Sequence, residues 1–310
     1  MKRFYCVYSY ECNVDCISCC LDREKKLRNN MRFTLDEMKN ALKKYQIGKD
    51  DILEISGGEP TLDKNMFINF TKYLVEEKGF QRNRINVLSN AQTFSDEDFV
   101  RKSSDYFGHI TSTFYGATEK VHDSFTRTPG SYFQKIAGLK NLKNEGVELH
   151  IKFLINKQNY ESITSFIDMC RSNFEKAHII IGWLCLIGEA WKNRNSLALK
   201  LSDAASNIEA AIGKAREYRL NLNITIPLCI IDPYYWEGTI PGDLTTGLEK
   251  IIFINPEKGV LERDSSDVPL LAKPTNKCDN CILKNRCVWE WEGYDKYYED
   301  IDSFLKPVQI

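Results

Sequence analysis

Short apolar runs rich in β-branched residues recur along the chain, and stretches with helical periodicity fill the intervals between them. These runs predict strands at residues 4–10, 51–56, 84–89, 109–114, 147–155, 177–187 and 221–227. Strands that alternate with helices favour parallel pairing through right-handed crossovers. The pattern therefore predicts an α/β fold, a partial (β/α)6 TIM-like barrel, with functional loops at the carboxyl ends of its strands.

Helix starts carry their own signals. Thr34 with Glu37, and Ser131 with Gln134, have the spacing of a capping box. Helices are predicted at about residues 34–46, 66–78, 95–106, 131–146, 159–174 and 196–218, of which the last is the longest.

Composition narrows the range of functions. The 310 residues include 42 Lys and Arg against 43 Asp and Glu, so the formal net charge is −1. This balance argues against binding to nucleic acid or to an anionic membrane surface. The start of the chain lacks the pattern of a signal peptide, and no apolar run approaches the roughly 18 residues of a membrane span, so we expect a cytoplasmic protein. In such a chain, 11 cysteines in clusters indicate metal binding more than disulfides.

The most informative cluster is C-x3-C-x2-C, formed by Cys12, Cys16 and Cys19 directly after the first predicted strand. Three thiolates in one short loop can hold three corners of a cubane iron–sulfur cluster, which leaves the fourth iron open to a small molecule. A zinc site is the main alternative. Zinc would need a fourth ligand nearby, where His is absent and only the adjacent Cys20 is available.

A second motif, Gly57-Gly58-Glu59-Pro60, follows the second predicted strand. The two motifs in this order resemble the radical S-adenosylmethionine (SAM) superfamily. The resemblance implies that the three cysteines hold a [4Fe–4S] cluster and that residues 57–60 bind the amino group of SAM. Glycine allows close approach of a ligand to the backbone, and the Glu59 carboxylate and free carbonyls can accept from an ammonium group. It also implies reductive cleavage of SAM to a 5′-deoxyadenosyl radical that removes hydrogen from an unactivated C–H bond.

The resemblance extends to later strands. Ser89 and Asn90 correspond to the end of the family's third strand, which faces the cofactor, and Thr113 corresponds to a hydroxyl that touches the SAM ribose. Either hydroxyl could instead cap a following helix. Lys152, in the fifth predicted strand, is placed to reach the SAM carboxylate or to pair with a neighbouring acid.

Two positions depart from the family pattern. Ser18 stands where the family usually has an aromatic residue that packs near the adenine, and Tyr115 replaces the usual Asp. His122, which follows in the same stretch, is expected to be a structural residue at a helix start.

A further cysteine group lies near the C-terminus. Cys278, Cys281 and Cys287 form C-x2-C-x5-C, and Cys229 follows the last predicted barrel strand, with a predicted hairpin at 250–262 between them. This order resembles the auxiliary-cluster extensions called SPASM and Twitch, and four cysteines imply one auxiliary [4Fe–4S] cluster. A zinc ribbon with four cysteine ligands uses similar spacing. We expect a radical SAM barrel at 1–228 and an auxiliary-cluster domain at 229–310.

One remaining thiol, Cys185, falls in the sixth predicted strand. A thiol facing the barrel interior can return a hydrogen atom to a substrate radical, whereas the alternative is a packed core cysteine.

The resemblance favours a maturase that cross-links or epimerises a ribosomally made peptide. It implies a reductant protein such as flavodoxin or ferredoxin. Because Met1 lies almost at the first strand, we expect any leader-peptide-binding domain to be a separate protein. A dehydrogenase or epimerase of a sugar or aminocyclitol is the alternative. A non-catalytic metal-binding electron carrier or sensor is a third, which would not need the Gly-Gly-Glu-Pro motif.

Overall fold

The computed structural model describes residues 1–22, 24, 31–236, 248–264, 276–283, 287, 292–301, 305, 306 and 308. Within these residues the strands form one sheet in the order β7-β6-β5-β4-β3-β2-β1-β8-β9. The strands are β1 (Lys2–Val7), β2 (Ile52–Ser56), β3 (Ile85–Leu88), β4 (His109–Phe114), β5 (Glu148–Ile155), β6 (His178–Trp183), β7 (Asn221–Thr225), β8 (Lys250–Asn255) and β9 (Gly259–Asp264). Strands β1 to β7 are parallel in sequence order, which confirms the predicted partial barrel.

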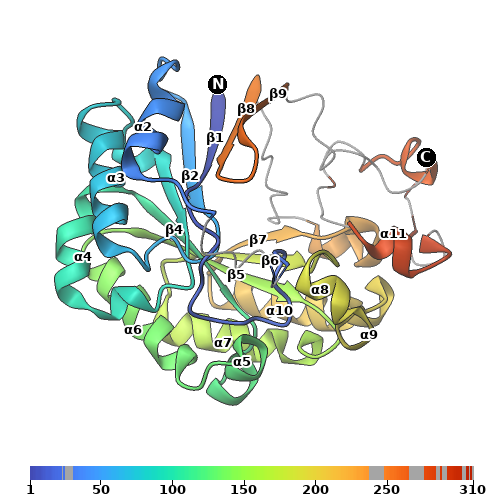
Figure 1. Ribbon diagram of the computed structural model, residues 1–310. Coiled ribbons are helices and arrows are strands. Elements are labelled where there is room, and N and C mark those ends of the chain that lie inside the picture. Colours follow the sequence, from blue (N-terminus) through green and yellow to red (C-terminus); the bar gives the residue numbers. More distant parts are fainter. Residues whose placement is uncertain are drawn as a thin grey trace.

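Helices follow most strands and line the outer side of the curved sheet (Figure 1). They are α2 (Leu35–Lys43), α3 (Lys64–Glu76), α4 (Glu97–Ser103), α5 (Glu119–Thr126), α6 (Ser131–Asn144), α7 (Ile163–Asn173), α8 (Glu189–Lys192), α9 (Arg194–Leu197), α10 (Ala205–Glu217) and α11 (Tyr294–Tyr297). The capping box at Thr34 is confirmed. The one predicted at Ser131 is wrong, because Gly130 is the N-cap and the Ser131 hydroxyl donates to Asp123 instead.

The predicted helix 196–218 is also wrong as one element. Helix α9 ends at Leu197, and a 3-10 turn precedes α10. Three successive residues, Leu197, Ala198 and Leu199, are all buried. A continuous helix would turn part of this segment toward solvent, so burial of all three favours the break.

The two faces of the sheet differ in chemistry. Along β2 to β6, every second side chain is buried on the helix-covered face, and nearly all of these side chains are apolar. Examples are Leu53, Val87, Ile110, Ile151 and Ile181. The intervening positions form the opposite, inner face, and the strand register aligns them in rows. The inner face carries the polar side chains Glu54, Asn86, His109, Thr113, Glu148, His150, Lys152 and His178. The sheet therefore encloses a polar interior.

The predicted hairpin is confirmed as β8 and β9, which pair antiparallel. Its position was missed by sequence reasoning: β8 pairs in parallel with β1, and the hairpin continues the barrel sheet beside β1 (Figure 1). The ring of Tyr5 stacks on that of Phe253, with centroids 5.1 Å apart. Across the described ranges, no helix combines the length and apolar character needed to cross a membrane.

Candidate functional site

The loop with the first three cysteines leaves the carboxyl end of β1 and is fastened to the end of α5. The backbone N–H of Asp15 donates to Thr126 O at 3.1 Å, and that of Ile17 donates to Phe125 O at 2.9 Å. The side chains of Cys12, Cys16 and Cys19 are all half-buried. The loop is therefore held by main-chain bonds while its thiols stay accessible.

The loop after β2 packs directly against this cysteine loop. The Gly58 N–H donates to Ser9 O at 3.1 Å, and the Glu59 N–H donates to Glu11 O at 2.6 Å. A Cβ atom at Gly58 would lie 2.0 Å from Glu11 O, and Gly57 has a φ of +132°. Both positions therefore require glycine, because the backbones of the two loops approach more closely than any side chain permits.

The Glu59 side chain is buried and joins its own loop to the end of β3. Its carboxylate accepts from Ser89 Oγ at 2.8 Å and from the Asn90 N–H at 2.6 Å. The Thr61 N–H and hydroxyl donate to it at 3.1 and 2.5 Å. Burial raises the pKa of Glu59, and these four donors oppose the shift. The structure thus brings the predicted residues Glu59, Ser89 and Asn90 together in one hydrogen-bonded unit.

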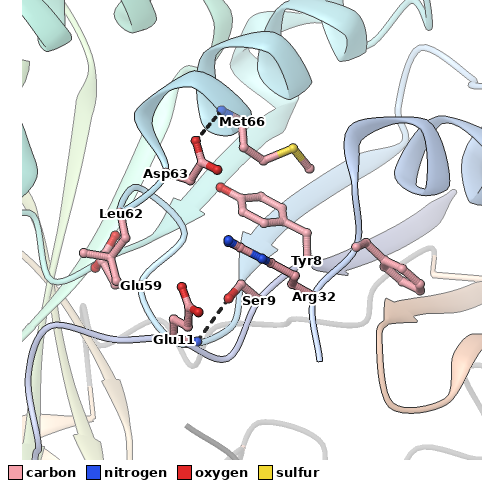
Figure 2. Close-up of a pocket in the computed structure, with 9 residues that line it drawn as sticks. Tyr8, Ser9, Glu11, Arg32, Glu59, Leu62, Asp63 and Met66 are labelled. Atoms are coloured by element: carbon pink, nitrogen blue, oxygen red, sulfur yellow. Dashed lines mark hydrogen bonds between the residues drawn. The ribbon is translucent and has the colours of Figure 1, made fainter. Parts of the chain in front are cut away.

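A small pocket lies between these two loops (Figure 2). It is lined by Tyr8, Ser9, Glu11, Arg32, Phe33, Glu59, Leu62, Asp63 and Met66. Sequence reasoning missed it, because Arg32 reaches this position only through a β-bridge with Ser9. The pocket brings the charged side chains of Glu11, Arg32 and Asp63 beside the cysteine loop.

The two departures from the family pattern meet in space. The Tyr115 side chain stacks on Phe125 with centroids 5.2 Å apart and lies close to Ser18 and Cys16. Burial raises the pKa of Tyr115 well above its ordinary value, and the Cys16 thiol adds to the shift. An aromatic ring from the end of β4 therefore lies beside the position where the cysteine loop itself has only a serine.

His122 fixes the backbone beside this ring. Its Nδ1 accepts the Tyr115 N–H at 3.3 Å, and the residue is fully buried in α5. Burial, with a further contribution from Lys135, lowers the pKa of His122 to about 2. The expected structural role of His122 agrees with this neutral, buried state.

Lys135 was missed by sequence reasoning. It lies in α6, where its spacing resembles that of ordinary surface lysines, yet it is 2% exposed. Its ammonium donates to Thr113 O and lies 4.9 Å from the centre of the Phe114 ring. Burial lowers the pKa of Lys135 to about 8, although Cys16 and Glu59 favour its charged form.

Thr113 and Lys152 are opposite each other in the pairing of β4 with β5, on the inner face. Glu54 in β2, on the same inner face, is close enough for the Lys152 charge to affect its pKa. Burial raises the pKa of Glu54, while Arg3 and Lys152 oppose that shift. Glu54 is therefore an acid in the neighbourhood of Lys152, although its ion pair is with Arg3 Nη1 at 3.7 Å.

Cys185 lies outside β6, contrary to expectation, because the strand ends at Trp183. The N–H of Leu186 donates to Glu292 O at 2.9 Å, which holds this loop against the C-terminal segment. The Cys185 thiol is close enough to Cys20, the neighbour of Cys19, to influence its titration. Cys185 is therefore near the cysteine loop although it is not a strand residue.

The four remaining predicted metal ligands converge. Cys229 lies in a short 3-10 turn, and its thiol is influenced by Cys278, Cys281 and Cys287. Burial raises the pKa of Cys229 to about 11, and the three other thiols add to the shift. A 3.1 Å bond from the Cys281 N–H to Cys278 O forms the turn between two of them.

Comparison with known proteins identifies the class. A family model described as the Radical SAM superfamily matches residues 6–170, which is more than half of the chain. The chain belongs to this superfamily. Members use SAM and a [4Fe–4S] cluster, so this is a radical SAM enzyme.

Curated relatives match over part of their length. Fe-coproporphyrin III synthase of Methanosarcina barkeri is 25% identical over 158 residues, 51% of this chain and 38% of that protein. AdoMet-dependent heme synthase of Nitratidesulfovibrio vulgaris is 21% identical over 159 residues, 51% of this chain and 42% of that protein. The match thus spans less than half of each of these relatives.

Solved structures match over nearly the whole chain. Streptococcus suis SuiB bound to precursor peptide SuiA has a TM-score of 0.63 and 16% identity, and the match covers 98% of this chain and 74% of that one. Native anSMEcpe with bound AdoMet and Kp18Cys peptide has a TM-score of 0.65 and 12% identity, covering 97% of this chain and 96% of that one. At these identities the likeness establishes the fold.

Proposed function

We propose that this radical SAM enzyme modifies a peptide, by cross-linking or epimerisation in natural-product maturation. The observation that carries the proposal is the correspondence along 97% of this chain and 96% of the AdoMet- and peptide-bound anSMEcpe. The curated tetrapyrrole enzymes correspond over only about half of this chain. The polar inner face supports the proposal, because it offers hydrogen-bonding partners to a peptide backbone.

The cysteine loop fits a [4Fe–4S] cluster held by Cys12, Cys16 and Cys19. The loop is fixed by main-chain bonds, its three thiols are half-buried, and it contains no histidine. When bound, the cluster supplies the electron for reductive cleavage of SAM. The chain's own contribution is to orient SAM and to keep water away from the reacting atoms.

The loop at residues 57–60 is proposed to bind SAM through its backbone. The Glu59 carboxylate is already satisfied by four donors, so it holds the loop in shape and leaves main-chain carbonyls for the SAM ammonium. Pro60 fixes the direction of the chain there.

On the neighbouring strands, Ser89 and Asn90 are proposed to support that loop. Thr113 and Lys152, paired across β4 and β5 on the inner face, are proposed to contact the SAM ribose and carboxylate. The Glu54 carboxylate, which pairs with Arg3 at 3.7 Å, is also near enough to Lys152 to compete with an anionic ligand for its charge.

The four converging thiols of Cys229, Cys278, Cys281 and Cys287 are proposed to bind the auxiliary [4Fe–4S] cluster. Full ligation by protein would suit electron transfer, in which the auxiliary cluster would take one electron from the substrate radical and so complete a two-electron oxidation of the substrate. We propose the division into a radical SAM barrel at 1–228 and an auxiliary-cluster region at 229–310, with β8 joining the second region to the barrel through β1.

Cys185 is proposed to donate hydrogen to the substrate radical if the product is an epimer. Its place beside Cys20, at the cysteine loop, supports this role. Cys185→Ala should retain 5′-deoxyadenosine release but lose incorporation of solvent deuterium into the product. Retention of deuterium at the wild-type level would exclude this thiol as the donor.

A tetrapyrrole substrate is the second candidate, because the curated relatives are named heme-type synthases. An enzyme acting on a tetrapyrrole would use the same SAM site, and only the substrate that enters the barrel would differ. The sugar or aminocyclitol alternative has no counterpart among these relatives.

The deciding experiment is 5′-deoxyadenosine release by the anaerobically reconstituted protein with SAM and dithionite. Separate reactions receive a peptide-enriched fraction of the host, its small-metabolite fraction, or Fe-coproporphyrin III. Stimulation by the peptide fraction, with a mass shift in one peptide, supports the proposal, and stimulation only by another addition overturns it. Cys12→Ala, the matched control, should release no 5′-deoxyadenosine in any reaction.

Two protein partners are proposed, a flavodoxin or ferredoxin that reduces the cluster and a separate leader-peptide-binding protein. Replacing dithionite by reduced flavodoxin should preserve turnover. A peptide lacking its leader segment should be modified more slowly if a leader-binding protein acts in the reaction.

A further inference from the structure

Three of the four histidines of this chain gather at the end of the barrel opposite the cysteine loop. His109 begins β4, His178 begins β6, and between them β5 begins with Glu148 and carries His150. The register places His109 opposite Glu148 and His150 opposite His178. Since alternate residues share a face, all four side chains lie on the inner face near the amino ends of the strands.

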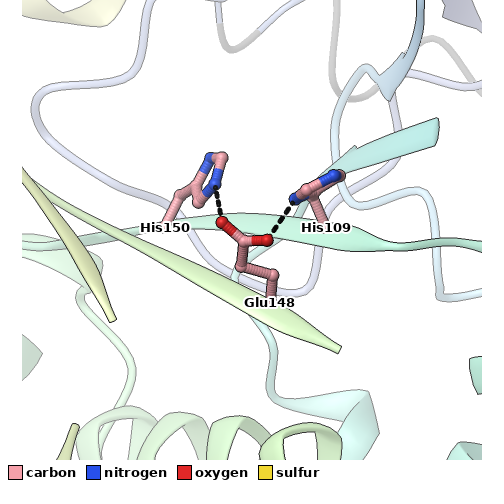
Figure 3. Close-up of side chains that lie close together, drawn as sticks. All are labelled: His109, Glu148 and His150. Atoms are coloured by element: carbon pink, nitrogen blue, oxygen red, sulfur yellow. Dashed lines mark ion pairs between the residues drawn. The ribbon is translucent and has the colours of Figure 1, made fainter. Parts of the chain in front are cut away.

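The side chains of His109 and His150 converge on the Glu148 carboxylate (Figure 3). His109 Nδ1 lies 3.5 Å from Glu148 Oε2, and His150 Nε2 lies 3.5 Å from Glu148 Oε1. One ligand atom from each of the three residues lies within 4.8 Å of the others. Two ligands each about 2.1 Å from a tetrahedral ion are separated by about 3.4 Å, so these distances match a shared metal with little movement.

The hydrogen bonds of His109 set its tautomer. Its Nε2 lies 2.8 Å from the carbonyl oxygen of Asn83, which can only accept, so Nε2 carries the proton. In the neutral imidazole, Nδ1 therefore has a free lone pair, and this buried atom has no hydrogen-bond partner among the described residues. A histidine that binds a metal usually donates the proton of its other ring nitrogen to a carboxylate or backbone carbonyl, as His109 Nε2 does here.

His178 holds the carboxylate from the third strand. Its Nε2 lies 2.7 Å from Glu148 Oε1, and its Nδ1 lies 2.7 Å from Asn221 Nδ2 at the start of β7. This orients Glu148 toward the two other imidazoles, as residues beyond the ligands commonly do in metal sites.

We propose that His109, Glu148 and His150 bind a divalent transition-metal ion such as zinc, with His178 as a positioning residue. Two imidazoles and one carboxylate suit zinc and leave a fourth position for water or another ligand. The ion would link β4 to β5 at the amino ends of the two strands. The alternative is a group of side chains without a metal, in which a protonated histidine forms an ion pair with Glu148.

The test uses zinc and the cluster-loaded holoenzyme, so that the cysteines are already occupied. After anaerobic equilibration with Zn2+ and removal of free metal, the wild-type protein should retain one zinc per chain with unchanged iron content. X-ray absorption at the zinc edge should give nitrogen and oxygen ligands at about 2.0–2.1 Å, whereas zinc at cysteines would give sulfur at about 2.3 Å.

Variants assign the site. His150→Ala and Glu148→Gln should weaken zinc binding by more than about 100-fold, and His178→Gln by about 10- to 100-fold. Glu145→Gln, an exposed carboxylate near the end of α6, is the matched control and should bind zinc as the wild type does. Equal zinc binding by wild type and His150→Ala, or sulfur ligation alone, would overturn the proposal. Iron content and circular dichroism verify that each variant is folded.

Discussion

The backbone N–H of Asn90 donates a 2.6 Å hydrogen bond to the Glu59 carboxylate, which ties the loop after β2 to the loop after β3. The same carboxylate accepts from Ser89 and Thr61, and Glu59 donates its own N–H to the cysteine loop at Glu11 O. Three loops from successive strand ends thus share one buried residue. Their relative positions depend on Glu59, whether or not it touches a ligand.

Glu59→Ala tests this positioning role. It leaves the Asn90 and Thr61 N–H groups without acceptors, and a buried unsatisfied donor costs about 1–3 kcal/mol. We expect the free energy of unfolding to fall by about 2–4 kcal/mol, together with loss of SAM binding in calorimetry. Glu59→Gln keeps an acceptor for Asn90 and should recover most of the stability. Loss of SAM binding without any loss of stability in Glu59→Ala would instead indicate direct contact between carboxylate and ligand.

Gly58→Ala tests the contact between the two loops. The new Cβ would lie 2.0 Å from Glu11 O and 2.4 Å from Tyr10 O, both backbone atoms that cannot rotate away. We expect a loss of about 1–3 kcal/mol in stability and lower retention of iron after reconstitution. Gly213→Ala in α10 is the matched control, since the nearest atom to its Cβ is 4.0 Å away. It should be neutral or stabilising, and equal iron retention in both variants would contradict the predicted clash.

The fold was largely predictable because strand signals are local. The run at 109–114 matches β4 from end to end, and apolar residues alternate on its helix-covered side. The pairing of β8 with β1 was not predictable, because it joins segments nearly 250 residues apart. The local sequence pattern of each strand does not indicate which other strand it pairs with. The break before α10 likewise depends on burial of residues 197–199 against the rest of the protein.

In the candidate site, the sequence indicated which residues take part, whereas their contacts with one another became visible only in the structure. The spacing of the cysteines and the Gly-Gly-Glu-Pro motif could be found from the sequence alone. The burial of Lys135 could not, because its neighbours in α6 include other lysines at similar helical spacing and only packing under Thr113 distinguishes it. The histidine group required the register of β4, β5 and β6.

The double variant Cys278→Ala and Cys281→Ala tests the auxiliary cluster. Removing two of its four proposed ligands should lower the iron content from about eight to about four atoms per chain. SAM cleavage should persist because the first cluster remains, while substrate turnover should fall. Cys170→Ala, a buried thiol in α7, is the control and should retain all iron. A wild-type protein that holds only about four iron atoms per chain, together with zinc, would instead favour a zinc ribbon at these cysteines.

His122 predicts a specific dependence of stability on pH. Its pKa is lowered to about 2 in the folded protein, mainly by burial, whereas an unfolded histidine has a pKa of about 6.5. Between these values the unfolded state binds a proton that the folded state does not, so stability falls as the pH falls below about 6.5. From pH 7.5 to 5.5 this single group should cost about 1.4 kcal/mol.

His122→Gln isolates that contribution, because the Gln oxygen can still accept the Tyr115 N–H but does not titrate. Denaturant unfolding of the anaerobic holoenzyme at pH 7.5 and 5.5 should therefore show a loss of stability smaller by about 1.4 kcal/mol in the variant than in the wild type. All other titrating groups are common to both proteins and cancel in the comparison. Identical losses in the two proteins would mean that His122 takes up a proton when folded, and that its burial is incomplete in solution.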